Sequence, residues 1–224
     1  LPSSARDALY WVRIQKPLTR LLGPYHQQNR DKIEIDLTFD CNLKCINCHR
    51  SCRQAPSVEM ISLEQIKKFI RENIEREKRW TSIILTGGEP TMHPDFPEIV
   101  SLFLDYKREF SPDTLIDVFT NGKGDDVNAA LNRVPPEVLV TNSHKTSFVN
   151  TFYAFNMAPV DLKEYRYADY VNACVNAQNC GIGLNCHGYY FCGVAAGIDR
   201  VFGFDIGRKK MPHPGERFRE QRRL

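Results

Sequence analysis

Residues 33–48 read IEIDLTFDCNLKCINC, and they carry the clearest structural pattern of the chain. Residues 33–39 alternate apolar with charged or polar side chains, which is the pattern of a β-strand. The strand runs directly into Cys41, Cys45 and Cys48, whose spacing is CxxxCxxC. The loop therefore presents three thiolates at the end of one strand, and this arrangement indicates a metal site.

Strand and helix patterns alternate beyond this loop. Residues 62–76 predict a helix, because Ser62 and Gln65 form a capping box ahead of an apolar stripe. The other predicted elements are strands at 82–86, 115–120, 138–141 and 152–158 and helices near 97–108 and 125–133. Such alternation favours parallel strands with right-handed crossovers. We therefore predict an α/β fold, a partial (β/α) TIM-type barrel with parallel strands followed by a small cysteine-rich module.

Unusual residues collect where the predicted strands end. The cysteines follow the first strand, TGGEP at 86–90 ends the second, and TNG at 120–122 ends the third. Ligands of parallel α/β sheets bind beyond the carboxyl ends of the strands. We expect one pocket to contain all three segments.

Two kinds of metal site suit the first cysteine group. Three thiolates are one short of the four that hold a 4Fe–4S cluster, which leaves one iron open for a small-molecule chelate. The alternative is a tetrahedral zinc site completed by His49 or Cys52. The cysteine spacing alone leaves both open.

The order of CxxxCxxC after the first strand and GGEP after the second resembles the radical SAM superfamily, over residues 33 to about 143. The resemblance implies a 4Fe–4S cluster on Cys41, Cys45 and Cys48, with S-adenosylmethionine (SAM) chelating the fourth iron through its amino and carboxylate groups. It also implies reductive cleavage of SAM to a 5′-deoxyadenosyl radical, which abstracts hydrogen from a substrate.

The same resemblance implies residues for SAM. Gly87 and Gly88 would bring the backbone close to its methionine end, and Glu89 would hold its ammonium group. Asn121 resembles a polar position that contacts SAM in many members. Asn47 stands where many members place an aromatic residue against the adenine, and it offers hydrogen bonds instead of stacking.

A second group of cysteines recurs with five residues between successive members, at Cys174, Cys180, Cys186 and Cys192. Four thiolates suit an auxiliary 4Fe–4S cluster, and the segment is similar to the SPASM or twitch modules of radical SAM proteins. The predicted hairpin GLNCHGYYFC has its turn at His187–Gly188. A zinc site, or fewer than four ligands, stays open.

Cys52 belongs to neither group. It is either a spare thiol or a hydrogen-atom donor that quenches a substrate radical, as a radical epimerase requires.

Composition narrows the class of protein. A net charge of +3 does not predict a nucleic-acid partner, and no run of about 18 apolar residues predicts a membrane span. Two cysteine groups around a cysteine-free segment, without a secretory signal, favour metal binding in the cytoplasm. The expected units are an extension (1–32), the partial barrel (33–160), the auxiliary module (161–207) and a basic tail (208–224). The tail is interpreted as a solvated, mobile segment, with a partner or substrate contact as the alternative.

The leading hypothesis is a radical SAM enzyme of the oxidoreductase, epimerase or bond-forming kind, with a flavodoxin or ferredoxin as electron donor. Its substrate is a small polar metabolite or a peptide. The roughly thirty residues before the first strand are short for a leader-binding domain, which favours a small molecule or a leader-independent peptide. A non-enzymatic electron carrier or cluster-binding regulator is the alternative, and a zinc-stabilised binding module comes third.

Overall fold

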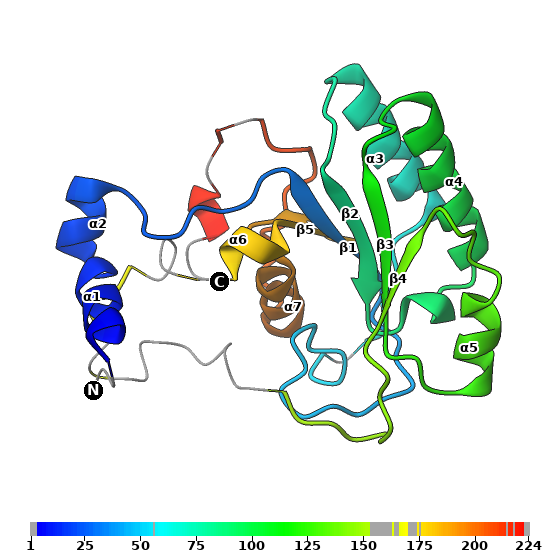
Figure 1. Ribbon diagram of the computed structural model, residues 1–224, viewed down its shortest axis with the longest axis horizontal. Coiled ribbons are helices and arrows are strands. Elements are labelled where there is room, and N and C mark those ends of the chain that lie inside the picture. Colours follow the sequence, from blue (N-terminus) through cyan, green and yellow to red (C-terminus); the bar gives the residue numbers. More distant parts are fainter. Residues whose placement is uncertain are drawn as a thin grey trace.

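A mixed sheet of six strands forms the centre of the molecule, in the order β4-β3-β2-β1-β5-β6 (Figure 1). This computed structural model describes residues 4–55, 57–152, 163, 166–169, 174, 176–213, 215–216 and 218–221. The strands are β1 (Lys32–Thr38), β2 (Ser82–Gly87), β3 (Leu115–Thr120), β4 (Leu139–Asn142), β5 (Ile182–Asn185) and β6 (Gly188–Tyr190). All neighbouring strands pair in parallel except β5 and β6. The predicted α/β class with parallel strands is confirmed, whereas the predicted strand at 152–158 falls almost wholly outside the described residues.

The direction of strand addition reverses at β1. From β1 the chain adds β2, β3 and β4 towards one edge, and β5 then pairs with the other side of β1. The hairpin of the expected auxiliary module is therefore an extension of the same sheet. Such a reversal is where parallel α/β sheets form a crevice for ligands.

Helices cover both faces of the sheet. In Figure 1, α3, α4 and α5 lie on one side and α7 on the other, while α1 and α2 stand apart from the strands. The helices are α1 (Ala5–Arg13), α2 (Lys16–Leu22), α3 (Leu63–Glu75), α4 (Phe96–Glu109), α5 (Asp125–Leu131), α6 (Ala177–Cys180) and α7 (Gly193–Phe202), with short 3₁₀ turns at Pro90–Met92 and Arg219–Gln221. The capping box of Ser62 and Gln65 is confirmed at the start of α3.

The two faces of β1 differ in chemistry. Ile33 and Ile35 are fully buried in the main apolar core, together with Ile66 and Phe69 of α3. The alternate residues of the strand project to the opposite face, where α7 lies. They include Glu34, which is 8% exposed, and they place charged side chains in the interior of the protein.

The basic tail differs from the prediction of a solvated segment. Met211 and Phe218 are buried in the core, and Gln221 donates a hydrogen bond of 2.9 Å to the backbone carbonyl of Tyr189 in β6. Arg208 forms ion pairs with Glu216 and Glu220. The segment is therefore bound to the hairpin by its buried apolar side chains, and its acidic residues neutralise Arg208.

The hairpin turn is one residue earlier than predicted. Asn185 pairs with Gly188, so Cys186 and His187 form the turn. Gly188 has φ +128°, and a Cβ there would lie 2.3 Å from the Arg208 carbonyl oxygen. Glycine is therefore required as the first residue of β6.

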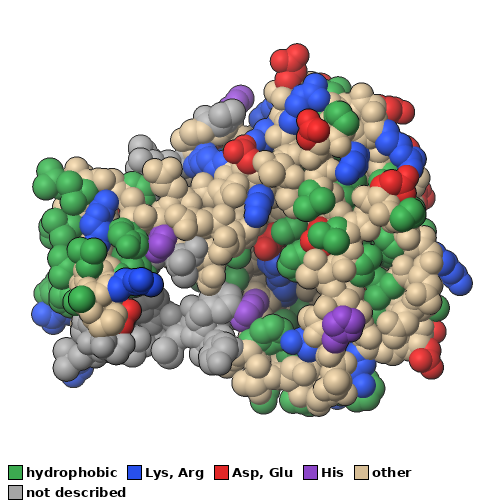
Figure 2. Space-filling view, viewed as in Figure 1, with side chains coloured by type: hydrophobic (Ala, Val, Ile, Leu, Met, Phe, Trp, Pro, Cys, Tyr) green, Lys and Arg blue, Asp and Glu red, His purple; other side chains and the backbone are tan. Residues whose placement is uncertain are grey.

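The surface carries both charge signs. Figure 2 shows Lys, Arg, Asp and Glu side chains interspersed over the visible face of the main body, while apolar side chains gather on the N-terminal helices. Leu9, Leu21 and Leu22 of those helices are more than half exposed. None of the described helices combines the length and apolar character that crossing a membrane requires.

Candidate functional site

Three loops meet at the carboxyl ends of β1, β2 and β3. The backbone N–H of Gly88 donates to the carbonyl of Thr38 at 2.7 Å, and that of Glu89 donates to the carbonyl of Asp40 at 2.8 Å. These bonds hold the GGEP loop against the chain that leads into Cys41. The first two strand ends therefore meet, whereas a single pocket that contains all three segments stays a prediction.

The two glycines permit this close approach. A Cβ at Gly87 would lie 2.3 Å from the Thr38 carbonyl oxygen, and one at Gly88 would lie 2.0 Å from that of Asp40 and 3.1 Å from the Cys41 Cβ. Real Cβ atoms do not approach oxygen this closely, so only glycine fits. Both glycines hold the first cysteine loop in place, while their contact with SAM stays a prediction.

Glu89 organises the site from the interior. Its carboxylate is fully buried and accepts hydrogen bonds from the Thr120 hydroxyl, from the Thr91 hydroxyl and from the backbone N–H of Asn121. Burial raises the pKa of Glu89, and these donors oppose the shift. The carboxylate thus joins the loops that follow β2 and β3, and its contact with a SAM ammonium stays a prediction.

Asn121 faces the first cysteine loop, and its contact with SAM stays a prediction. Its side-chain amide donates to Asn42 Oδ1 at 2.8 Å and lies 3.9 Å from Cys41 Sγ. The backbone N–H of Leu43 points to the same sulfur at 3.4 Å. Amide donors around a sulfur stabilise its thiolate form, and that form is the metal ligand.

A segment after β4 completes the surroundings of the cysteines. Asn150 Nδ2 lies 3.9 Å from Cys45 Sγ, and Ile46 forms a parallel bridge with Thr151. Asn47 has φ 54° and donates from its side chain to the Phe152 carbonyl at 3.2 Å. The sequence reasoning missed Asn150, because no motif marks a loop residue that meets a distant sulfur.

The thiols of Cys41, Cys48 and Cys52 differ in acidity. The Cys52 thiol donates a hydrogen bond to the Cys48 sulfur, and this bond is the main reason why the pKa of Cys48 falls to about 5. The same bond, with burial, raises the pKa of Cys52. Burial raises the pKa of Cys41 to about 11. Cys48 is therefore a thiolate at neutral pH and Cys52 a buried thiol beside it.

The donor set fits an iron-sulfur cluster. No three Cys, His, Asp or Glu side chains of the described ranges surround one point closely enough to bind a single metal ion. A cubane cluster makes a different demand, since its thiolates bind separate irons. Three thiols on one short loop, with amide donors at two of the sulfurs, suit that demand.

A group of buried charged side chains lies next to the first cysteine loop, on the face of β1 that α7 covers. Arg50 Nη2 contacts Glu34 Oε2 at 2.6 Å, and Arg50 Nε lies 3.4 Å from Asp36 Oδ1. Burial raises the pKa of Asp36 to about 6, and Arg50 opposes the shift. This ion-pair cluster was missed from the sequence, although two acids on one face of a buried strand are a signal for a buried cation.

The second cysteine group lies around the β5–β6 hairpin. Cys180 ends α6, Cys186 lies in the turn, and Cys192 caps α7 by accepting a hydrogen bond of 3.5 Å from the Ala195 N–H. Cys174 is exposed. Cys180, Cys186 and Cys192 are therefore spread around the hairpin, and the role of the four cysteines in an auxiliary cluster stays a prediction.

Comparison with known proteins gives one family. The sequence model described as "Radical SAM superfamily" matches residues 35–139. This range includes the first cysteine group, the GGEP loop and Asn121, and it ends before the second cysteine group.

Three relatives illustrate the similarity. A probable GTP 3′,8-cyclase of Methanococcus maripaludis is 35% identical over 98 residues, which are 44% of this chain and 30% of the relative. A 7,8-dihydro-6-hydroxymethylpterin dimethyltransferase of Methanocaldococcus jannaschii is 36% identical over 38% of this chain and 17% of its own. An Fe-coproporphyrin III synthase of Methanosarcina barkeri is 30% identical over 46% and 24%. The chain thus spans less than a third of the length of these relatives.

Among solved structures, the chain is similar to BtrN, crystallised in complex with AdoMet and 2-DOIA. The TM-score is 0.48, with 13% sequence identity over 75% of each chain.

Proposed function

We propose that the chain is a radical SAM enzyme that reductively cleaves SAM and abstracts a hydrogen atom from a small polar molecule, because the radical SAM superfamily model matches residues 35–139. The enzymes of this family use a 4Fe–4S cluster and SAM. When bound, the cluster supplies the electron that breaks a carbon–sulfur bond of SAM and yields the 5′-deoxyadenosyl radical. The observation that carries the proposal is the meeting of Cys41, Gly88 and Asn121 at three adjacent strand ends.

The residues of this site have separate tasks in the proposal. Cys41, Cys45 and Cys48 would hold the cluster, and the amides of Asn121 and Asn150, each 3.9 Å from a sulfur, would donate to two of the ligating sulfurs. The glycine pair keeps side chains out of the space next to the loop, and Glu89 fixes the loop that presents them. Asn47 donates to the adenine of SAM.

The names of the relatives support a small molecule over a peptide. They mention GTP, a dihydropterin and a coproporphyrin. The site lies at the carboxyl end of β1, between β2 and β5, and open α/β sheets bind their ligands where the strand order reverses in this way. A flavodoxin or ferredoxin is the proposed electron donor, and the second cysteine group is the proposed auxiliary-cluster site.

The test uses the anaerobically reconstituted full chain with SAM and dithionite. We expect 5′-deoxyadenosine to form slowly alone and several times faster when a substrate is added from a panel of purine nucleotides, pterins and tetrapyrroles. A deuterated substrate should transfer deuterium into 5′-deoxyadenosine. If a peptide library accelerates the reaction and no small molecule does, the small-molecule proposal is wrong.

A further inference from the structure

The second group of cysteines is divided by the hairpin. Cys180 lies just before β5 and Cys192 just after β6 ends, while Cys186 lies in the turn between the strands. Because the strands are antiparallel, with Gly183 opposite Tyr190, the first two cysteines share one end of the hairpin. Cys186 lies at the other end.

The separation along the hairpin is large for one cluster. The four residues of β5 lie between Cys180 and Cys186, and at a rise of about 3.3 Å per residue they span roughly 13 Å. By contrast, the backbone of Cys192 packs on the start of β5, since a Cβ at Gly183 would lie 2.6 Å from the Cys192 carbonyl carbon.

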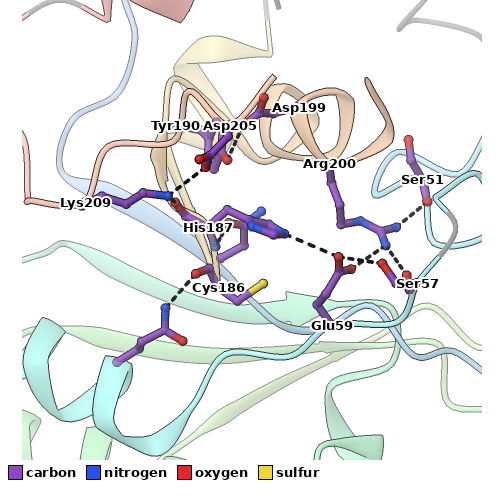
Figure 3. Close-up of polar contacts among 12 residues, drawn as sticks. Ser51, Ser57, Glu59, Cys186, His187, Tyr190, Asp199, Arg200, Asp205 and Lys209 are labelled. Carbon is purple, nitrogen blue, oxygen red and sulfur yellow. Dashed lines mark hydrogen bonds and ion pairs between the residues drawn. The ribbon is translucent and has the colours of Figure 1, made fainter. Parts of the chain in front are cut away.

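The charged groups near Cys180 and Cys192 differ from those near Cys186. Cys180 is influenced by the thiols of Cys192 and Cys174, and Cys192 by that of Cys174. Cys186 has other neighbours, Glu59 and Arg200, and Figure 3 shows its sulfur on the side of the turn that faces Glu59. Cys180 and Cys192 therefore share one end of the hairpin and have Cys174 among their electrostatic neighbours, whereas Cys186 lies near other charged groups.

The three-cysteine end suits an anionic cluster. The N-terminus of α7 directs the Ala195 N–H at Cys192 Sγ, and helix N-termini favour negative charge. The buried Arg50 Nη1 has no hydrogen-bond partner, and it points at the same helix end, 1.5 Å from where a Cβ of Gly193 would lie. The charge of Arg50 is paired with Glu34, whose Oε2 lies 2.9 Å from the same Cβ position, and Cys180 is a further electrostatic neighbour of the guanidinium. Arg50 therefore lies near Cys180 as well as at the start of α7, where it favours the negative charge of thiolate ligands.

We propose that the auxiliary cluster is held by Cys174, Cys180 and Cys192, and that Cys186 is not one of its ligands. The fourth iron of this cluster would then be bound by a group other than these four cysteines. This inference rests on the proposed function for the presence of a second cluster, and it narrows the four expected ligands to three.

The test uses the full chain with Cys41, Cys45 and Cys48 all replaced by alanine, so that only the second site can hold a cluster. After anaerobic reconstitution we expect about four irons per chain and the electron paramagnetic resonance signal of a reduced 4Fe–4S cluster. Adding Cys186→Ala should leave both unchanged. Adding Cys180→Ala or Cys192→Ala should remove most of the iron.

A footprint on the unmutated protein gives a second measurement that does not depend on variants folding. For each cysteine, the labelling rate with iodoacetamide in the reconstituted protein is divided by its rate in the iron-free protein. We expect this ratio to be at least tenfold higher for Cys186 than for Cys180 and Cys192. Equal protection of all three, loss of iron on Cys186→Ala, or no iron in the triple variant would overturn the proposal. Failure to cleave SAM by wild-type protein, with the second cluster intact, would count against the proposed function and leave this inference standing.

Discussion

The carboxylate of Glu89 accepts a hydrogen bond of 2.8 Å from the backbone N–H of Asn121, which lies 32 residues further along the chain. This bond connects the GGEP loop after β2 with the TNG loop after β3, and both loops border the first cysteine group. Because Glu89 is fully buried, no water can replace the bond.

Glu89→Gln tests this connection. The carboxylate of Glu89 accepts hydrogen bonds from Thr91, Thr120 and Asn121. In glutamine an NH₂ group replaces one carboxylate oxygen, and because NH₂ is a donor it cannot accept these bonds. We expect the free energy of unfolding in urea to fall by about 1–3 kcal/mol. The control is Glu98→Gln on the exposed face of α4, for which we expect a change within about 0.5 kcal/mol. Equal effects of the two substitutions would show that the buried connection does not stabilise the fold.

Gly88→Ala tests the close approach of the GGEP loop. The new methyl group would lie 2.0 Å from the Asp40 carbonyl oxygen, so the backbone before Cys41 must move. We expect the reconstituted protein to lose most of the iron of the first cluster, measured in a background with Cys180 and Cys192 replaced by alanine.

The matched control is Gly203→Ala after α7. Gly203 has φ +63° and no atom within 4 Å of the Cβ position, so alanine there adds only backbone strain of about 1–2 kcal/mol. Its iron content should match that of the same background with glycine retained. Full iron in Gly88→Ala would mean that the loop does not position the ligands.

Cys52→Ala tests the hydrogen bond to Cys48 in the iron-free protein. Because this bond is the main reason why the pKa of Cys48 lies at about 5, its loss should raise that pKa by one unit or more. Alkylation of Cys48 near pH 6, followed by mass spectrometry, should slow severalfold, whereas Cys52→Ser keeps a hydroxyl donor and should slow it less. An unchanged pH profile would contradict the contact. The role of Cys52 as a hydrogen-atom donor stays a prediction.

Asp36→Asn tests the buried ion-pair cluster through pH. The pKa of Asp36 is raised by burial from 3.8 to about 6 in the folded protein. Between these values the folded state binds the proton more tightly than the unfolded state, so stability falls as pH rises from about 4 to about 6. The wild-type free energy of unfolding should therefore drop by about 2 kcal/mol relative to Asp36→Asn over this range, at 1.36 kcal/mol per pKa unit. A pH-independent difference between the two proteins would refute the shift.

Much of the sheet could be predicted from local pattern. The alternation in β1, the buried run of β2 and the capping box before α3 each specify an element within a few residues, because periodicity and capping are local. Which side of the sheet β5 joins is not local. Its pairing with β1 depends on the apolar face that Ile182 and Leu184 offer next to Ile33 and Ile35.

The site divides in the same way. The cysteines, the GGEP loop and Asn121 were predicted to meet because parallel strands bring their ends together. Asn150 reaches Cys45 through loop contacts that no spacing encodes. The basic tail was misread because its charges were weighed without the apolar Met211 and Phe218 between them.

The most direct measurement of the central claim is the formation of 5′-deoxyadenosine by anaerobically reconstituted protein with SAM and dithionite, beside Cys48→Ala prepared in the same way. The account predicts product from the wild type and none above background from the variant. A wild-type protein that carries a full complement of iron and sulfide, binds SAM and yet forms no 5′-deoxyadenosine would contradict it.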